Sequence, residues 1–414
     1  MWDALSSGSW VTAARVRAVS AMVLAATILA MLLLFVTAHG TLDAMGRPLG
    51  TDFSDVWTAG WMANHGRAAA AWNWPDHYAV QQAIHHDAAV PFYGWHYPPP
   101  FLMLAALLAR MPYVWALVVW QGVTLSLALG VVCRIAPRRG VPLAALGAPV
   151  VLICLGHGQN AFLTGALLGG GMLLLDRRPW LAGLLLGCLV YKPQFAVLIP
   201  VVLIAAGNWR AFLGAALAVS LLCGLTLALW GWPVWAAFIE SLTITRTVVI
   251  EQGNTGWEKI QSAFSAIRMW GGPIPLAYAV QGFVTGAAIL TAAFVARWGG
   301  MASRATAVLA AALLCTPYVL DYDFVVLGIA IAFMAADMRL RGALRWEATI
   351  LASAWILPLF ARQVTAVTLV PLELIAAIAV LALAARRAIA LDGAPHPGGW
   401  LHRLPSLRDH PAAQ

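Results

Sequence analysis

Long apolar stretches recur along the chain between residues 18 and 385, and shorter polar segments separate them. A membrane-spanning helix needs about 20 apolar residues, fewer where it ends at a water-filled site. The pattern therefore predicts an all-α polytopic membrane protein with about twelve transmembrane helices. The expected helices lie at about 18–38, 113–133, 141–155, 161–175, 180–191, 194–206, 211–230, 276–296, 305–319, 323–336, 347–360 and 365–385.

Composition supports a lipid environment. The 414 residues are 62% hydrophobic and 10% charged, whereas a soluble domain has about 45–50% and 25%. This excludes a soluble globular enzyme. The five cysteines lie inside apolar stretches without a CxxC pair, so we predict neither a disulfide framework nor a thiolate metal site.

The basic residues follow the expected topology. The net charge is +8, yet short basic clusters between apolar stretches indicate positive-inside loops rather than nucleic-acid binding. Both termini are predicted to be cytoplasmic. We expect one membrane domain over residues 1–387 and a disordered cytoplasmic tail at 388–414. The arginines expected on the cytoplasmic side are Arg134, Arg138, Arg139, Arg177, Arg178, Arg210, Arg297, Arg304, Arg339, Arg341, Arg345, Arg386 and Arg387.

One short apolar stretch, from Pro98 to Ala109, decides the number of predicted transmembrane helices. Prolines bound it on both sides, which favours an interfacial or re-entrant helix. If it crosses the membrane instead, the count becomes thirteen and the arginine argument weakens.

Five polar segments are expected to meet at the extracytoplasmic face. The first loop is much longer than is required to connect the two helices that flank it, and it carries many carboxylates, histidines and aromatic residues. Carboxylates can act as general bases, and aromatic faces stack on sugars or line headgroups. The segments are 39–97, which includes juxtamembrane helices, 156–160, 191–194, 231–275 and 318–323.

The paired carboxylates Asp52 and Asp55 are the first candidates within this loop. They are three residues apart and share one face if the segment is helical. One interpretation is a general base. The other is that Thr51 or Asp52 caps a juxtamembrane helix while Asp55 is solvated.

Lys192 is one of only two lysines and lies between two apolar half-spans. A cation at that depth costs about 2.5–3.5 kcal/mol and needs an anionic partner or a wet cavity. A lipid phosphate is one candidate partner, exposed by the helix break at Pro193. The alternative is a lysine that ends one helix and extends to the headgroups.

Other candidates lie in two turns. Residues 156–160 place His157, Gln159 and Asn160 between glycines, where an amide can bond hydroxyls or phosphate, although such turns also simply join short helices. A second turn carries acidic residues beside a span. We consider the segment 85–87 a surface feature rather than a metal site, because adjacent histidines diverge on a helix. The acidic turn contributes Asp321, Tyr322 and Asp323.

Together these motifs resemble glycosyltransferase family 87, a group of polyprenol-phosphate-dependent GT-C membrane enzymes that includes mycobacterial phosphatidylinositol-mannoside mannosyltransferases. The resemblance covers most of residues 15–340. The motifs that carry it are Asp52-Phe53, Tyr97-Pro98-Pro99, Gly158-Gln159-Asn160, and Tyr191-Lys192-Pro193 after Ala182-Gly183.

This resemblance implies a GT-C-like bundle in the bacterial plasma membrane with an extracytoplasmic active site. It implies inverting transfer of a sugar, often mannose, from a polyprenyl-phosphate donor to a lipid or glycan acceptor, with Asp52 as general base and no metal or cofactor. Lys192, Gln159, Asn160, His157, Asp55, the acidic turn and Tyr97 are expected to bind donor phosphate or acceptor. Mycobacterial relatives carry histidines where this chain has 321–323, so substrate identity does not transfer.

The rival hypothesis is a secondary transporter or flippase, since about twelve spans with both ends inside also suit a transporter. Transporters usually place ionisable residues at the midplane of repeated halves, whereas here they gather toward one face and no repeat is visible. Transfer is therefore the preferred hypothesis.

Overall fold

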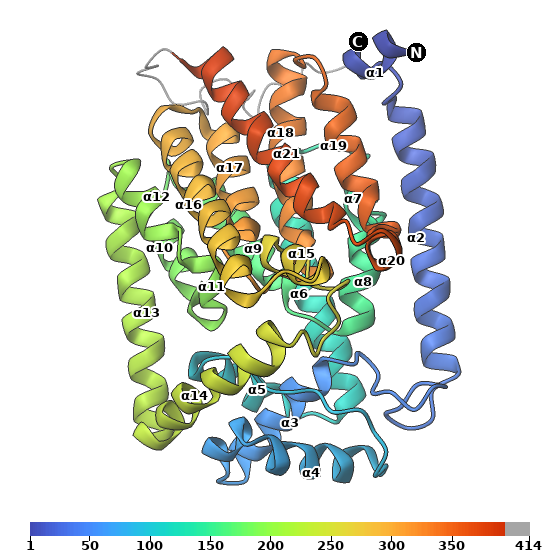
Figure 1. The fold of residues 1–414 in the computed structure, drawn as a ribbon, viewed down its shortest axis with the longest axis vertical. Coiled ribbons are helices and arrows are strands. Elements are labelled where there is room, and N and C mark those ends of the chain that lie inside the picture. The colour runs from blue at the N-terminus through green and yellow to red at the C-terminus, as the bar shows by residue number, and fades with distance from the viewer. Residues whose placement is uncertain (394–414) are drawn as a thin grey trace, which may run out of the picture.

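The computed structural model describes residues 1–393, which form helices joined by turns and three isolated β-bridges. The helices make one elongated bundle (Figure 1). The short helix α1 (Trp2–Ser7) and the C-terminal end of α21 (Leu372–Arg387) lie at its upper end in that view. Helices α3 (Phe53–Asn64) and α4 (Trp74–His85) lie at its lower end.

Six helices are long and apolar enough to cross a membrane, and a bent pair brings the number to seven. They indicate an integral membrane protein. The bent pair is 347–359 with 361–368, which meet at 81°. The six are α2 (Ala13–Val36), α6 (Tyr113–Ile135), α13 (Trp209–Trp230), α14 (Trp232–Ile244) continued by the π-helix η3 (Thr245–Glu251), α16 (Ile274–Trp298), and α21 continued by the π-helix η6 (Ala388–Asp392).

The remaining apolar segments form shorter helices. Several stretches expected to be single spans are short or broken, so the count of about twelve stays a prediction. The bounds are α5 (Pro99–Leu108), α7 (Val141–Leu146), α8 (Pro149–His157), α9 (Ala161–Leu174), α10 (Pro179–Gly187), η2 (Cys188–Tyr191), α11 (Pro193–Ala196), α12 (Ile199–Ala205), α17 (Met301–Leu314), α18 (Val325–Arg341), α19 (Glu347–Ile356), η5 (Leu357–Leu359) and α20 (Ala361–Thr368). The short helices η1 (Ala68–Trp72), α15 (Ala263–Met269) and η4 (Asp321–Phe324) belong to the connections.

Three expected boundaries differ from the structure. The stretch 141–155 breaks between α7 and α8, because Pro149 begins a new helix and lacks the N–H that would continue the first. The segment 231–275, expected to be a polar loop, begins with the 20-residue apolar helix Trp232–Glu251. The chain remains helical beyond 387, as the π-helix η6. The Asp392 side chain at its end accepts hydrogen bonds from the Gly300 N–H and the Ser303 hydroxyl. The rest of the expected tail, 394–414, lies outside the described residues.

Helix α5 has ten residues and is therefore about 15 Å long, half the hydrocarbon thickness of a bilayer. It is too short to cross a membrane by itself. This length agrees with the interfacial or re-entrant interpretation of Pro98 to Ala109.

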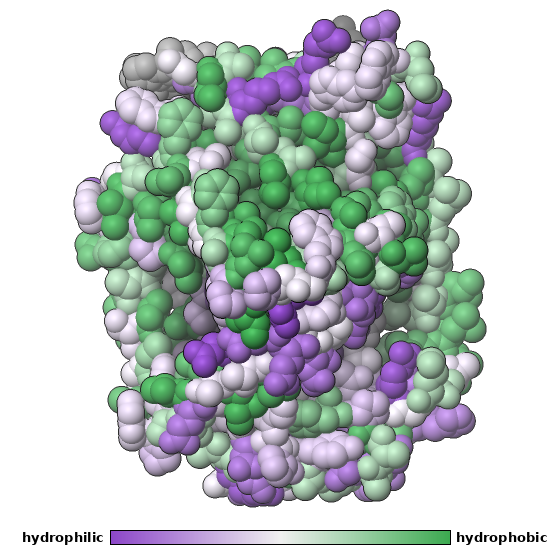
Figure 2. Space-filling view, in the orientation of Figure 1, coloured by the Kyte–Doolittle hydropathy of each residue, from purple (hydrophilic) through white to green (hydrophobic). Residues whose placement is uncertain are grey.

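Helices α2 and α17 show the two environments of the bundle. Every residue of α17 except Arg304 is buried, and its many alanines allow close packing against α16, α18 and α21. By contrast, only 17% of the apolar window of α2 is buried. Thr12 starts α2 by accepting a hydrogen bond from the Arg15 N–H at 3.2 Å. Figure 2 shows apolar side chains over the upper middle of one face and hydrophilic ones at the upper end and in the lower third.

Candidate functional site

Asp52 immediately precedes α3, but its side chain does not cap that helix. Its Oδ2 atom instead accepts a hydrogen bond from the Gln159 amide at 2.9 Å. Asp55, one turn along α3, is only 6% exposed. Burial, together with the charge of Asp52, raises the pKa of Asp55 well above its usual value. The interpretation of Asp52 as a cap and Asp55 as a solvated carboxylate is therefore wrong.

The turn at Gly158 brings Gln159 to Asp52. Gly158 has a φ of 63°, and a Cβ there would lie 2.7 Å from the Gly50 carbonyl oxygen, closer than real Cβ atoms approach. Glycine is needed both for this left-handed conformation and for the close contact. From α6, the Trp120 indole donates to the Gly158 carbonyl at 3.0 Å and the side-chain amide of Gln121 donates to the Gln159 carbonyl at 3.0 Å.

A continuous chain of hydrogen bonds runs from Asp52 through Gln159 into the bundle. The Gln159 Oε1 atom accepts from the Tyr97 hydroxyl at 3.2 Å and from the Asn160 N–H at 3.1 Å. The Asn160 Oδ1 atom accepts from Lys192 Nζ at 3.0 Å. Lys192 also donates to Asp323 at 2.6 Å. The structure thus joins four sequence-distant segments that were predicted to meet, and we call this chain of residues the Asp52–Asp323 network.

Lys192 is 4% exposed and lies between η2 and α11, where Pro193 starts a new helix. Its ammonium lies 5.4 Å from the centre of the Tyr322 ring. Burial raises the pKa of Asp323, and the charge and hydrogen bond of Lys192 oppose that shift. A lysine that extends to the headgroups would not be enclosed in this way, so the structure rules out that alternative.

His157 ends α8 beside the Asp52 carboxylate. Its Nδ1 atom is 2.9 Å from the Thr51 hydroxyl and 3.9 Å from Asp52 Oδ1. Its ring centre is 5.9 Å from that of Tyr322. Burial lowers the pKa of His157, the charge of Asp52 raises it, and the charge of Arg362 lowers it. The imidazole is therefore favoured in its neutral form.

Arg362, at the start of α20, was not identified from the sequence. Its Nε atom lies 3.6 Å from Asp321 Oδ2, and its side chain is 27% exposed. Burial raises the pKa of Asp321 to about 7, and the nearby charges of Asp52 and Asp323 add to this effect. A sequence signal existed, since Arg362 falls between two apolar stretches on the face where the expected topology places few arginines.

Several buried polar atoms around the network have no hydrogen-bond partner within residues 1–393. They are Asp55 Oδ1, Asn160 Nδ2, Asp321 Oδ2 and Arg362 Nη2. Buried polar groups are normally paired, and exceptions in a native protein need an explanation. The side chains of Asp52 and His157 are 25% and 20% exposed. The cluster thus combines an accessible carboxylate with donors and acceptors that a polar ligand can engage.

The predicted residues thus lie at one site, with two qualifications. Asp55 is close to Asp52 but shares no hydrogen bond with the network, and Asp321 pairs with Arg362 rather than with a member of the network. His85 uses both ring nitrogens, toward the Thr41 and Ser54 hydroxyls at 2.8 Å each, which is a structural role. Among the residues the structure describes, no group of three or more potential metal ligands occurs.

Comparison with known proteins identifies one family. No curated protein and no solved structure matches the chain. The model of glycosyltransferase family 87 matches residues 95–320, more than half of the 414 residues. The matched region includes Tyr97, Gln159, Asn160 and Lys192, whereas Asp52 precedes it and Asp323 follows it. On this match, the chain belongs to glycosyltransferase family 87.

Proposed function

We propose that this glycosyltransferase moves a sugar, with mannose the leading expectation, from a polyprenyl phosphate to a lipid or glycan acceptor with inversion. Family membership supports a glycosyltransferase. The observation that carries the finer proposal is the placement of Asp52, which is partly exposed and held by Gln159 at 2.9 Å beside unpartnered buried polar atoms.

Asp52 is the proposed general base. The acceptor hydroxyl oxygen attacks the anomeric carbon on the face opposite the phosphate, and its proton passes to the Asp52 carboxylate. The bond between the anomeric carbon and the phosphate oxygen breaks, and its electron pair leaves with the polyprenyl phosphate. Because Gln159 occupies Oδ2, the Oδ1 atom is the one that faces the acceptor. Asp55 and Asp321 are proposed to contact acceptor hydroxyls.

The leaving phosphate needs positive charge and dipoles placed in advance. Asn160 Nδ2 is a buried donor without a hydrogen-bond partner among residues 1–393, and Lys192 fixes the Asn160 amide by bonding its oxygen at 3.0 Å. Arg362 adds a cation near Asp52. We propose that Lys192, Gln159 and Asn160, assisted by His157 and Tyr97, hold the donor phosphate, while Asp323 positions the Lys192 ammonium and Tyr322 lies beside it.

We further propose a GT-C-like bundle in which the Asp52–Asp323 network faces the extracytoplasmic side and the short apolar helices complete about twelve crossings. The lower end of the bundle, which carries α3 and α4, lies opposite α1 and the end of α21 (Figure 1). This arrangement agrees with cytoplasmic termini.

The test is the variant Asp52→Asn in liposomes that contain a polyprenyl-phosphate mannose and lipid extract as acceptor. A general base contributes about 10²- to 10⁴-fold to rate, so we expect transfer to fall by that factor while donor binding persists. Asp87→Asn, in the same loop but outside the network, is the matched control and should retain full activity. Transferred sugar is measured by mass spectrometry of the acceptor.

Full turnover by the Asp52→Asn variant would remove its catalytic role. Movement of unmodified sugar lipid across the bilayer without a covalent product would support transport instead.

A further inference from the structure

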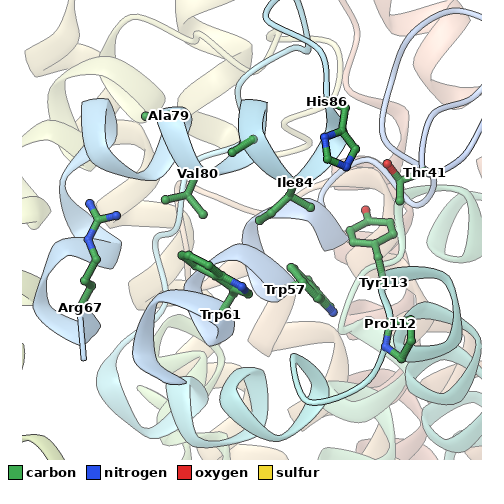
Figure 3. Close-up of a pocket in the computed structure, with 11 residues that line it drawn as sticks. Thr41, Trp57, Trp61, Arg67, Ala79, Val80, Ile84, His86, Pro112 and Tyr113 are labelled. Carbon is green, nitrogen blue, oxygen red and sulfur yellow. The ribbon is translucent and has the colours of Figure 1, made fainter. Parts of the chain in front are cut away.

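A groove of about 640 Å³ lies between α3, α4 and the start of α6 (Figure 3). None of its lining residues belongs to the Asp52–Asp323 network. We call it the α3–α4 groove. Such a volume is within the range of small-molecule sites, about 300–1,000 Å³. Its walls are mainly apolar, and the proposed reaction does not use them. The principal wall residues are Trp57, Trp61, Val80, Ala83, Ile84 and Tyr113.

Three polar side chains of the wall already have hydrogen-bond partners within the protein. The Trp57 indole donates to a backbone carbonyl at 3.0 Å, and the Tyr113 hydroxyl donates to another at 2.7 Å. The Thr41 hydroxyl is 2.8 Å from a ring nitrogen of His85. A sugar ring needs several hydrogen bonds from its site, whereas these three groups are bonded within the protein and the rest of the wall is mainly apolar. The groove therefore suits a hydrocarbon chain.

The groove lies where two candidate membrane spans end. Thr41 follows α2, whose last residue is Val36, and Tyr113 is the first residue of α6. Val36 is 80% exposed, as expected of a lipid-facing position. Tryptophans such as Trp57 and Trp61 are enriched at this depth of a bilayer. A lipid chain can thus enter the groove from the adjacent leaflet.

The charge of the groove favours an anionic headgroup. Arg67 and His86 line it, and within residues 1–393 no carboxylate does. Arg67 contacts Asp76 at 3.3 Å, but both side chains are nearly half exposed, at 44% and 48%. An exposed ion pair of this kind is weak, so a lipid phosphate can replace the Asp76 carboxylate beside the Arg67 guanidinium.

From these observations we infer that the α3–α4 groove binds one chain of an anionic phospholipid, with the phosphate beside Arg67. Trp57 and Trp61 belong to α3, the helix that Asp52 precedes. The bound lipid therefore packs against the face of α3 that meets α4 and stabilises the position of this helix. This inference is independent of which sugar or acceptor the enzyme uses.

The test uses the full chain in phosphatidylcholine nanodiscs that contain a trace of phosphatidylglycerol with a diazirine near one acyl-chain end. After photolysis, mass spectrometry measures label on residues 57–86 relative to α2, the internal reference for bulk lipid. Ala83→Trp fills the groove and should lower that ratio about tenfold. Ala88→Trp, in the exposed turn after α4, is the matched control and should leave it unchanged.

A second pair of variants tests the headgroup. Arg67→Gln should reduce groove labelling by phosphatidylglycerol about fivefold and leave labelling by a phosphatidylcholine probe unaltered. Arg246→Gln, which alters another exposed arginine, should change neither. Equal labelling in Ala83→Trp and wild type would overturn the site. Competition by a polyprenyl phosphate but not by unlabelled phosphatidylglycerol would overturn the choice of lipid.

Discussion

Buried charges occur in two regions of the bundle, and they differ in how completely they are hydrogen-bonded. At the upper end in Figure 1, Arg387 donates to Asp337 at 2.5 Å and to Glu347 at 2.6 Å, and all three side chains are fully buried. Arg341 donates to Asp337 and to Asp392, each at 2.5 Å. We call these five residues the arginine–carboxylate cluster. At the other site, the Asp52 and His157 side chains are partly exposed, and neighbouring polar atoms have no hydrogen-bond partner in the part of the chain that the structure describes.

This contrast separates a structural network from a binding site. In the cluster, two guanidiniums and three carboxylates bond one another closely, and only Glu347 Oε1 lacks a partner within the described residues. Arg341 is 24% exposed, but Arg387, Asp337 and Glu347 are enclosed and fix α18, α19 and α21 together. In and around the Asp52–Asp323 network, the atoms without a hydrogen-bond partner among the described residues and the accessible Asp52 carboxylate can form hydrogen bonds to a substrate. Substitutions in the cluster should therefore affect stability, and substitutions in the network should affect activity.

The largest stability effect is expected from Arg387→Met. It leaves Glu347 buried without its cation and leaves Asp337 with Arg341 alone, which costs about 3–5 kcal/mol. The fall in Tm in detergent measures this, with Arg386→Met, the exposed neighbour, as control. A Tm equal to wild type would mean that the cluster does not stabilise the fold.

A smaller loss of stability, about 1–3 kcal/mol, is expected from Lys192→Met. Asp323 keeps the Leu320 N–H at 3.1 Å, and its raised pKa lets it become neutral by protonation. Transfer should fall sharply, because Asn160 loses the bond that orients its amide. The double variant Lys192→Met/Asp323→Asn should recover Tm but not activity. Recovery of both would reduce Lys192 to a structural role, and unchanged donor affinity in Lys192→Met would remove its phosphate role.

The smallest effect concerns pH. Because the pKa of Asp321 is raised to about 7 in the fold from 3.8, the fold favours its protonated form. Its contribution to stability is therefore complete below pH 4 and is lost as pH rises toward 7. Relative to Asp321→Asn, wild type should lose on the order of 1 kcal/mol between pH 5 and 7. Parallel Tm curves for the two proteins would contradict the shift.

The meeting of the site segments was predictable from topology alone. Alternation of apolar stretches places Asp52, the 156–160 turn, Lys192 and the 321–323 turn on one face, and the structure joins them. The topology could not predict which side chains of these segments form hydrogen bonds or ion pairs with one another. The sequence suggested a lipid phosphate as partner for Lys192, whereas the structure pairs it with Asp323 at 2.6 Å. Side chains far apart in sequence find one another only when helices pack.

Helix boundaries were predicted less well than helix positions. Hydropathy registers how apolar a stretch is but not where it bends, so the 81° bend after Leu359 and the break before Pro149 were missed. The segment 231–275 was predicted as one polar loop, whereas its first 20 residues after Gly231 form an apolar helix. Arg362 was missed for a related reason, since it lies at the bend between two apolar stretches.

The sequence by itself determined that this chain is helical and embedded in lipid, because the free energy of burying so many apolar residues depends on composition and order alone. It also predicted that the four segments of the Asp52–Asp323 network meet. Only the tertiary structure decided which of their atoms are bonded and which remain available, because hydrogen bonds act over about 3 Å and depend on the packing of whole helices. That distinction makes the arginine–carboxylate cluster a structural element and the Asp52–Asp323 network a candidate active site.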